Sequence, residues 1–327
     1  MAVQITIVGL GQIGASFGLA LASQPELVRR VGHDRQPEIA RKAEKMGALD
    51  KVMLNLPAAV QDADLVLLSV PIDQLHDTLA VIAPVLKEGS VVMDTAPVKE
   101  AVAAWAAELL PADRHYVGLT PVINPLYLEE PASGLEAAHA DLFHGGLIAI
   151  VAPPRTNSEA IKLAADLARL VGASPFFVDP LEIDGLMAAT HLLPQLLAAG
   201  LINSTADQPG WREGRKVAGR AYAEATGPII HLGDSKALKA SVLLNRENTL
   251  RVIDSAIAAL QIIRTDIDAQ DGEALLKRLE RARTSREKWW KERQVGDWVE
   301  SDGGPAPEIP DVFGRLFGVR RKPKNKP

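Results

Sequence analysis

The sequence predicts an α/β fold in which a doubly wound parallel sheet is followed by an all-α domain. Three observations support this prediction. A glycine-rich turn joins an apolar strand to an alanine-rich helix at the start of the chain. Strand and helix patterns then alternate as far as about residue 180, and long helical patterns replace them beyond it. The 327 residues are therefore expected to form a sheet domain over 1–180, a helical domain over 181–293 and a flexible tail over 294–327.

The glycine-rich turn has the arrangement of a dinucleotide site of the Rossmann type. A strand over Val3–Val8 runs into the turn, and a helix follows it. The first glycine allows a tight turn, the second lets the backbone approach a pyrophosphate, and the third lets the helix pack closely on the strand. The helix N-terminus adds free N–H groups. A nicotinamide or flavin nucleotide is therefore expected to contact Gly9, Leu10, Gly11, Gln12, Ile13 and Gly14.

A carboxylate closes the second predicted strand, Val28–His33. Asp34 lies twenty positions after Gly14, where a carboxylate can accept hydrogen bonds from the adenosine ribose hydroxyls. The same carboxylate would repel the 2′-phosphate of NADP, so NAD is the expected cofactor. Arg35 keeps NADP possible, since its guanidinium could bind that phosphate.

The remaining elements of the sheet domain follow from apolar runs and their boundaries. Strands are expected at residues 65–70, 90–95, 115–119, 146–152 and 174–178. Helices are expected at residues 73–85, 98–110 and 158–170, the last capped by Ser158. Because doubly wound sheets bind ligands at the carboxyl ends of their strands, the cofactor is also expected to contact Ser69, Val70, Pro71 and Thr95.

The sequence of the helical half predicts long helices and also a homodimer. Long helices are expected over residues 183–204, 212–226 and 235–267. Apolar runs such as residues 253–260 exceed what one small helical core requires, which favours a homodimer built on this domain. The chain after residue 298 is rich in proline and glycine and ends in a basic cluster, so it is expected to be a mobile tail.

Composition excludes several classes of function. A net charge of -5 gives no general attraction to nucleic acid, and the absence of cysteine excludes disulfides, thiolate nucleophiles and cysteine metal sites. The histidines show no regular pairing, so no metal site is expected. No apolar run reaches the roughly 18 residues of a membrane span, and the chain enters a strand without a leader, so a cytoplasmic protein without a membrane segment is expected.

Six segments of the sheet half together form a recognisable pattern: residues 9–16, 32–35, 63–71, 94–99, 142–143 and 170–173. In their sequence and order they resemble prephenate and arogenate dehydrogenases. The resemblance implies hydride transfer from a cyclohexadienyl acid to NAD(P), with loss of carbon dioxide and aromatisation of the ring, in a homodimer. It covers about residues 3 to 290 and includes a Trp211-Arg-Glu segment in the helical half.

The substrate half departs from the family pattern. The family's loop serine is Pro97 here, and the histidine that takes the substrate proton in the family is matched by Thr120. The arginine that holds a substrate carboxylate is matched by Lys216, with Arg215 beside it. Three further histidine positions of the family are occupied by Ile183, Leu192 and Gln195.

The remaining titratable side chains suggest another base. His191 is the best candidate, because Asp184, His191 and Gln195 would share one face of a regular helix. The alternative is a core histidine bonded to a backbone carbonyl. Lys99 could bind a carboxylate or act as an acid, or it could make a structural contact at a helix N-terminus.

Two classes of function remain open from the sequence. The first is an NAD(P)-dependent dehydrogenase of a small carboxylate-bearing alcohol, with prephenate as one candidate and catalysis by His191, Thr120 and Lys99. The second is a cofactor-binding protein that has lost or changed the catalysis and serves as a sensor or partner subunit. In the first case the substrate is expected to contact Asn124, Gln195, Arg215 and Lys216, although Thr120 and Asn124 could equally belong to a structural loop.

Overall fold

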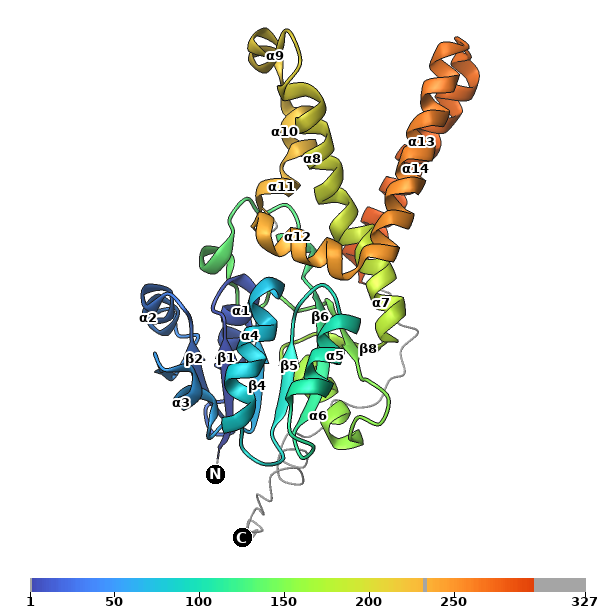
Figure 1. Ribbon diagram of the computed structural model, residues 1–327. Helices are drawn as coiled ribbons and strands as arrows, with labels where there is room; N and C mark the ends of the chain where they lie inside the picture. The colour runs from blue at the N-terminus through green and yellow to red at the C-terminus, as the bar shows by residue number, and fades with distance from the viewer. Residues whose placement is uncertain (1, 232–233, 297–327) are drawn as a thin grey trace.

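The computed structural model describes residues 2–231 and 234–296, and its centre is a single eight-stranded sheet (Figure 1). The strand order is β3-β2-β1-β4-β5-β6-β7-β8, and all neighbours are parallel except the antiparallel pair β6 and β7. The strands are β1 (Val3–Val8), β2 (Val28–His33), β3 (Lys51–Val52), β4 (Leu65–Leu68), β5 (Val91–Asp94), β6 (His115–Val122), β7 (Leu147–Val151) and β8 (Ser174–Phe177).

Helices cover both faces of the sheet. One apolar core forms around the contact of Phe17 with Phe143, and the other contains Leu75, Leu79 and Val102. The central strands are buried on both faces, which explains their continuous apolar runs. The doubly wound α/β fold predicted from the sequence is thereby confirmed. Its helices are α1 (Gln12–Leu21), α2 (Pro37–Lys45), α3 (Leu56–Val60), α4 (Ile72–Ile82), α5 (Glu100–Leu109) and α6 (Ser158–Leu170).

Three of the differences between the sheet half and the sequence prediction have a clear physical reason. The two-residue strand β3 was not predicted, because Lys51 and Val52 are too few to give a pattern. Helix α6 is capped by Asn157 rather than Ser158, since the Asn157 side chain accepts a hydrogen bond from the backbone of Glu159 at 2.8 Å. Strand β6 continues through Pro121 to Val122, because the antiparallel strand β7 pairs along this extension.

The described residues after β8 form helices arranged as two arms (Figure 1). Helices α8 to α10 make one arm, and the hairpin of α13 and α14 makes the other, with α12 lying across the top of the sheet half. The helices are α7 (Pro180–Met187), a π-helical turn (Ala188–Leu192), α8 (Leu193–Ala206), α9 (Trp211–Val217), α10 (Arg220–Thr226), α11 (Pro228–His231), α12 (Ser235–Leu244), α13 (Arg246–Asp268) and α14 (Gly272–Val295).

Each long helix predicted for this half is interrupted. The prediction over 183–204 meets the π-helical turn, the one over 212–226 is broken before Arg220, and the one over 235–267 is broken at Asn245. Helix α14 reaches Val295, two residues beyond the expected end of the helical domain at residue 293, and residues 297–327 lie outside the described part of the chain. The division into domains at residue 180 stays a prediction.

One continuous helical stretch, Pro180–Ala206, is long and apolar enough to cross a membrane by length and composition, with a mean hydropathy of 1.5 over its best window. We expected no such stretch, because Pro194 and Gln195 interrupt the apolar run; the helix instead continues through both. A core helix passes the same test. This helix contacts the sheet half through Ile183, which packs on Ala149 and Val151 of β7.

Candidate active site

Three glycines shape the turn between β1 and α1. Gly9 has φ +89°, and a Cβ atom there would overlap the carbonyl oxygen of Ser69. A Cβ atom on Gly14 would overlap the carbonyl oxygen of Gly9, whereas one on Gly11 would meet no described atom within 4 Å. Glycine is therefore required at positions 9 and 14 by the protein itself, and the space over position 11 is open to a ligand.

The N-terminus of α1 opens into the same space. Gly11 is the N-cap residue, and no described side chain caps the helix or places a carboxylate in its first turn. The first backbone N–H groups of a helix have no partner within the helix, and they carry the positive end of its dipole. The turn and the helix start therefore fit a pyrophosphate, which the backbone of Gly11, Gln12 and Ile13 would hold.

Asp34 lies beside the turn at the end of β2. One carboxylate oxygen accepts a hydrogen bond from the backbone N–H of Leu10 at 2.9 Å, and the other accepts one from Gln36 at 2.8 Å. These two bonds fix the carboxylate while leaving it partly exposed, and Arg35 next to it is exposed. Asp34 is thus held beside the glycine turn, where the sequence analysis expects it to contact the adenosine ribose of the cofactor.

Ser69 and Thr95 face each other across the ends of two neighbouring strands. The Thr95 hydroxyl donates to Ser69 Oγ at 3.2 Å, and Ser69 also lies against the glycine turn. Strand β1 stands between β2 and β4, so the strand order reverses here, and this is where doubly wound sheets bind ligands. The predicted cofactor contacts therefore gather at one edge of the sheet.

We expect Asp34→Asn to lower the preference for NAD over NADP by about tenfold, because a like charge placed against the 2′-phosphate is removed. Asparagine keeps an oxygen for the Leu10 N–H, so the turn itself should be preserved. Titration of both cofactors against both proteins measures the change. Tighter binding of NADP than of NAD by the unmodified protein would contradict the role given to Asp34 and favour Arg35 as a phosphate ligand.

Lys99 is fully buried beneath the loop that follows β5. Its ammonium lies 2.7 Å from Asp94 Oδ1, and the Tyr116 hydroxyl donates to the other carboxylate oxygen at 2.7 Å. Burial lowers the pKa of Lys99, and the charge of Asp94 opposes this shift. The sequence left two roles open for Lys99, a contact with the substrate and a structural contact. An ammonium that is buried and paired in this way favours the structural contact.

Asp184 connects α7 to the start of α5. Its carboxylate oxygens accept hydrogen bonds from the backbone N–H groups of Lys99 at 2.6 Å and Glu100 at 3.1 Å, so it caps a helix that is 84 residues away in sequence. Asn245 donates to the Asp184 carbonyl oxygen at 2.7 Å. Burial raises the pKa of Asp184, and the two backbone hydrogen bonds oppose this shift. The sequence showed Asp184 as a polar residue on an apolar helix but gave no sign of its partner.

His191 lies within the π-helical turn between α7 and α8. The side chain is half-buried, and burial lowers the pKa of its imidazole. Turns of this kind occur frequently at functional sites. The Gln195 side chain is buried and donates to the backbone oxygen of His191 at 2.9 Å. Because the π-turn lies between Asp184 and Gln195, the spacing of a regular helix does not apply here. Gln195 is hydrogen-bonded to the backbone of His191, whereas the Asp184 carboxylate is bonded to the start of α5.

Thr120 and Asn124 have different surroundings. Thr120 lies inside β6, opposite Ala149, rather than in the loop expected from the sequence, and it is 4% exposed. Its hydroxyl has no hydrogen-bond partner among the described residues. The Asn124 amide, in contrast, accepts from the Leu126 N–H and donates to the Asp141 oxygen. Thr120 therefore retains an unused polar atom, whereas Asn124 is occupied within its own loop.

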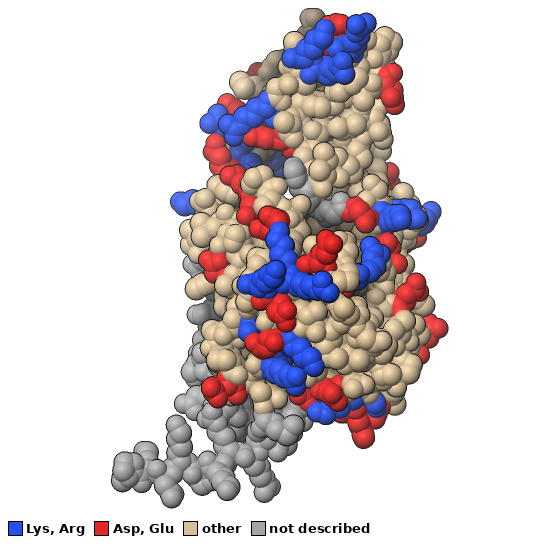
Figure 2. All heavy atoms as spheres, turned by 90° about the vertical axis from the view of Figure 1, so that its left-hand side faces the viewer, with Lys and Arg blue, Asp and Glu red and all other residues tan. Residues whose placement is uncertain are grey.

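Arg215 and Lys216 lie on α9, which Figure 1 shows at the far end of an arm. Both side chains are exposed, and Lys216 pairs with Glu213 of the same helix. Figure 2 shows basic side chains gathered at this end of the molecule. The structure therefore does not bring these two residues to the glycine turn of the same chain.

Comparison with known proteins connects this geometry to a family. The family model of the prephenate dehydrogenase nucleotide-binding domain matches residues 17–176. The cyclohexadienyl dehydrogenase of Zymomonas mobilis is 28% identical over 284 residues, which are 86% of this chain and 94% of that protein. The prephenate dehydrogenase of Bacillus subtilis is 26% identical over 291 residues, which are 86% of this chain and 75% of that protein.

Solved structures share the fold over nearly the whole chain. A prephenate dehydrogenase from A. aeolicus, in complex with hydroxyphenyl propionate and NAD+, matches with a TM-score of 0.78 and 23% identity, covering 88% of this chain and 98% of that one. A Synechocystis arogenate dehydrogenase matches with a TM-score of 0.69 and 23% identity, covering 88% and 99%. The resemblance seen in the sequence is confirmed: residues 17–176 match the prephenate dehydrogenase nucleotide-binding domain, and most of the chain is similar to prephenate and cyclohexadienyl dehydrogenases.

Proposed function

We propose that this protein oxidises prephenate or arogenate with NAD as the hydride acceptor. The observation that carries the proposal is the glycine turn with Asp34 fixed beside it, in a chain whose curated relatives are named cyclohexadienyl and prephenate dehydrogenases. The direct test is the appearance of NADH absorbance when the purified protein is mixed with NAD and either acid. The alternative function, a cofactor-binding sensor, would show NAD binding without turnover of either acid.

Bound NAD supplies the acceptor for the hydride that leaves the hydroxyl-bearing ring carbon. The chain has to hold that cofactor, orient the acid and remove the hydroxyl proton. Loss of the hydride and the proton converts the hydroxyl to a carbonyl. The bond from the ring to the carboxylate then breaks, carbon dioxide leaves, and the electron pair of that bond passes through the ring to the carbonyl oxygen, giving an aromatic phenolate that takes back a proton. The turn residues and Asp34 serve the first task, while the second and third require side chains from the substrate half.

We assign to His191 the role of general base, which accepts the proton of the substrate hydroxyl. Its lowered pKa keeps the imidazole neutral at neutral pH, which is the form that accepts a proton. The unpartnered hydroxyl of Thr120 is suited to hydrogen bond a polar group of the acid without titrating. These assignments give His191 the pH-dependent step and Thr120 a role in orientation.

We expect His191→Asn to reduce turnover on the order of 100-fold, the usual scale for loss of a general base, while NAD affinity stays nearly unchanged. In the unmodified enzyme, turnover should fall as the pH drops through the pKa of His191, below its ordinary 6.5 because burial lowers it. Thr120→Ala should act more mildly and mainly on KM. The measurement is turnover against pH for all three proteins. Unchanged turnover in the His191 variant, with the same pH profile, would show a core histidine.

The second part of the proposal is a cytoplasmic homodimer joined through the helical arms. The apolar helix Pro180–Ala206 buries only 22% of its most hydrophobic window within one chain. The two arms also expose large apolar side chains that a second copy could cover. They include Leu197, Leu250, Ile257, Leu260, Ile262 and Ile267. In such a dimer, Arg215 and Lys216 would be available to the carboxylate of a substrate bound to the partner, because they lie away from their own glycine turn.

We expect light scattering at micromolar concentration to give twice the mass of the chain. In the double variant Leu260→Asp and Ile257→Asp, the measured mass should shift toward that of the monomer. Both side chains are about half exposed in one chain, at 59% and 47%, so their replacement should not disturb the core of the protomer. Lys288→Asp, also on an exposed arm surface, is the matched control. A monomeric mass for the unmodified protein would reject the dimer.

A further inference from the structure

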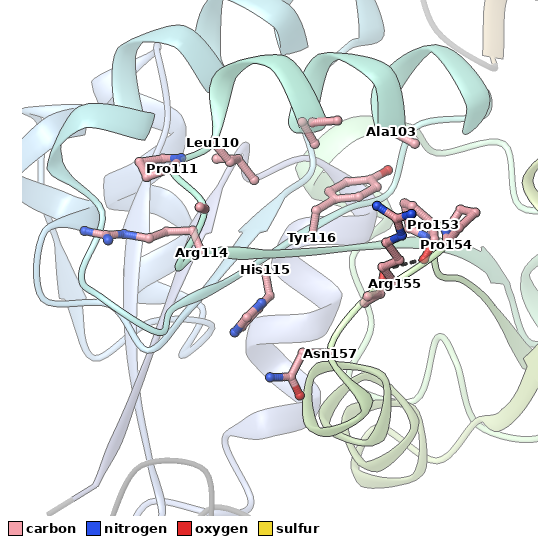
Figure 3. A pocket seen from close by; sticks show the side chains of 14 residues that line it. Ala103, Leu110, Pro111, Arg114, His115, Tyr116, Pro153, Pro154, Arg155 and Asn157 are labelled. Atoms are coloured by element: carbon pink, nitrogen blue, oxygen red, sulfur yellow. Dashed lines mark hydrogen bonds between the residues drawn. The ribbon is translucent and has the colours of Figure 1, made fainter.

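A cavity of 280 Å³ opens at the edge of the sheet where β6 begins (Figure 3). The β1 and β6 strands run in the same direction within the sheet, so this edge is opposite to the one that carries the glycine turn. Helix α5 forms one wall of the cavity, and the loop 153–157 between β7 and α6 forms another. The cavity is therefore separate from the cofactor crevice and has no part in the proposed function.

The lining of the cavity is basic. Arg114, His115 and Arg155 contribute to it, and it contains no aspartate or glutamate. Arg114 is occupied, since it pairs with Asp113 and its Nε donates to the Leu86 oxygen at 3.1 Å. Neither His115 nor Arg155 takes part in an ion pair with any residue that the structure describes. The Arg155 side chain extends toward Tyr116 (Figure 3) and is exposed, so its guanidinium is available to an anion.

The start of α6 adds neutral donors to these charges. Asn157 lines the cavity and caps this helix of 13 residues, using its side-chain oxygen for the Glu159 N–H. Its amide NH₂ group remains as a donor, and the helix dipole places positive potential at the same point. A carboxylate near Arg155 and Asn157 would thus meet a charged donor and a neutral one.

The opposite side of the cavity is apolar and built from small residues. Ala103, Ala106 and Ala107 of α5 leave space that larger side chains would fill, and Leu110 and Pro111 continue this surface. The volume lies just below the range of about 300 to 1,000 Å³ that is usual for small-molecule sites. An occupant must then be small, with an apolar body against α5 and an anionic group toward Arg155.

We propose that this cavity binds a small carboxylate with an apolar body, at a site distinct from the dehydrogenase centre. The carboxylate lies against Arg155 and Asn157, and the apolar body lies on the alanines of α5. The combination of a basic end and an apolar wall distinguishes this site from a surface that attracts any anion. Inorganic phosphate could pair with Arg155, but it has no apolar part to pack against the alanines of α5.

Calorimetric titration of the intact protein with phenylacetate tests the proposal. Phenylacetate should bind, whereas neutral phenylacetamide and inorganic phosphate should bind at least about tenfold more weakly. Arg155→Gly should weaken phenylacetate binding by a similar factor, and Arg155→Lys should retain part of it. Arg155 has φ +72°, a conformation that glycine adopts without strain, so the glycine variant is expected to fold.

A second variant separates this cavity from the substrate site, which also attracts carboxylates. Ala107→Trp fills the cavity from an exposed position on α5, so it should abolish phenylacetate binding while NAD affinity stays unchanged. Binding that persists in both Arg155→Gly and Ala107→Trp would place phenylacetate elsewhere and overturn the proposal. Equal binding of phenylacetate and phenylacetamide would overturn it as well. Neither result depends on dehydrogenase activity.

Discussion

Gly11→Ala is expected to weaken NAD binding on the order of 100-fold while leaving the stability of the unliganded protein unchanged. The new methyl group would meet no described atom of the protein within 4 Å, and the backbone of Gly11 is extended, which alanine adopts freely. The methyl group would instead occupy the space through which the pyrophosphate approaches the helix N-terminus. Its cost should therefore appear only when the cofactor binds.

Gly14→Ala is the matched variant with the opposite expectation. Here the methyl group would overlap the carbonyl oxygen of Gly9 and approach the Ser69 side chain, so the turn and α1 must separate. Overpacking of this kind costs about 1–3 kcal/mol and should lower the free energy of unfolding without any ligand. Denaturant unfolding and NAD titration of both variants give the comparison. Equal stability loss in the two variants would show that Gly11 is not the position facing the cofactor.

The cofactor half could be predicted because its information is local. The turn, the start of α1 and the carboxylate at Asp34 all lie within the first 34 residues, and each position has one physical requirement that the residue meets. The strands of this half are buried on both faces, so their apolar runs are continuous and easy to recognise. The same features explain why the doubly wound sheet was predicted from the sequence.

The substrate half could not be predicted in the same way, because its contacts join distant segments. Asp184 caps α5 across 84 residues, and no periodicity in either segment indicates this bond. Thr120 was placed in a loop because Pro121 follows it, yet the antiparallel partner β7 extends the strand beyond both residues. The π-turn at His191 is equally invisible in the sequence, since its residues are ordinary helix formers. The π-turn packs against α12 and α13, which lie far from it in the sequence, and packing of this kind leaves no local pattern.

Lys99→Met is expected to destabilise the protein by about 3–5 kcal/mol, the usual cost of removing one partner from a buried ion pair. Both side chains of the Lys99 and Asp94 pair are fully buried. Among the described residues, the remaining carboxylate would keep the Tyr116 hydroxyl and the Ala96 N–H as its donors. Methionine has nearly the length of the lysine stem, so it should keep most of the packing beneath Gly118, and the loss should come mainly from the missing ammonium. Denaturant unfolding measures the change.

Adding Asp94→Asn to the Lys99→Met protein separates charge from packing. Asparagine is neutral and its oxygen can still accept from Tyr116, so the double variant should recover part of the stability lost by Lys99→Met, because no unpaired charge remains buried. Lys42→Met serves as the exposed control, since its pair with Glu136 lies at the surface and should contribute far less. If Lys99→Met instead left stability unchanged and reduced turnover, the lysine would act on the substrate. The structural role that its burial supports would then be wrong.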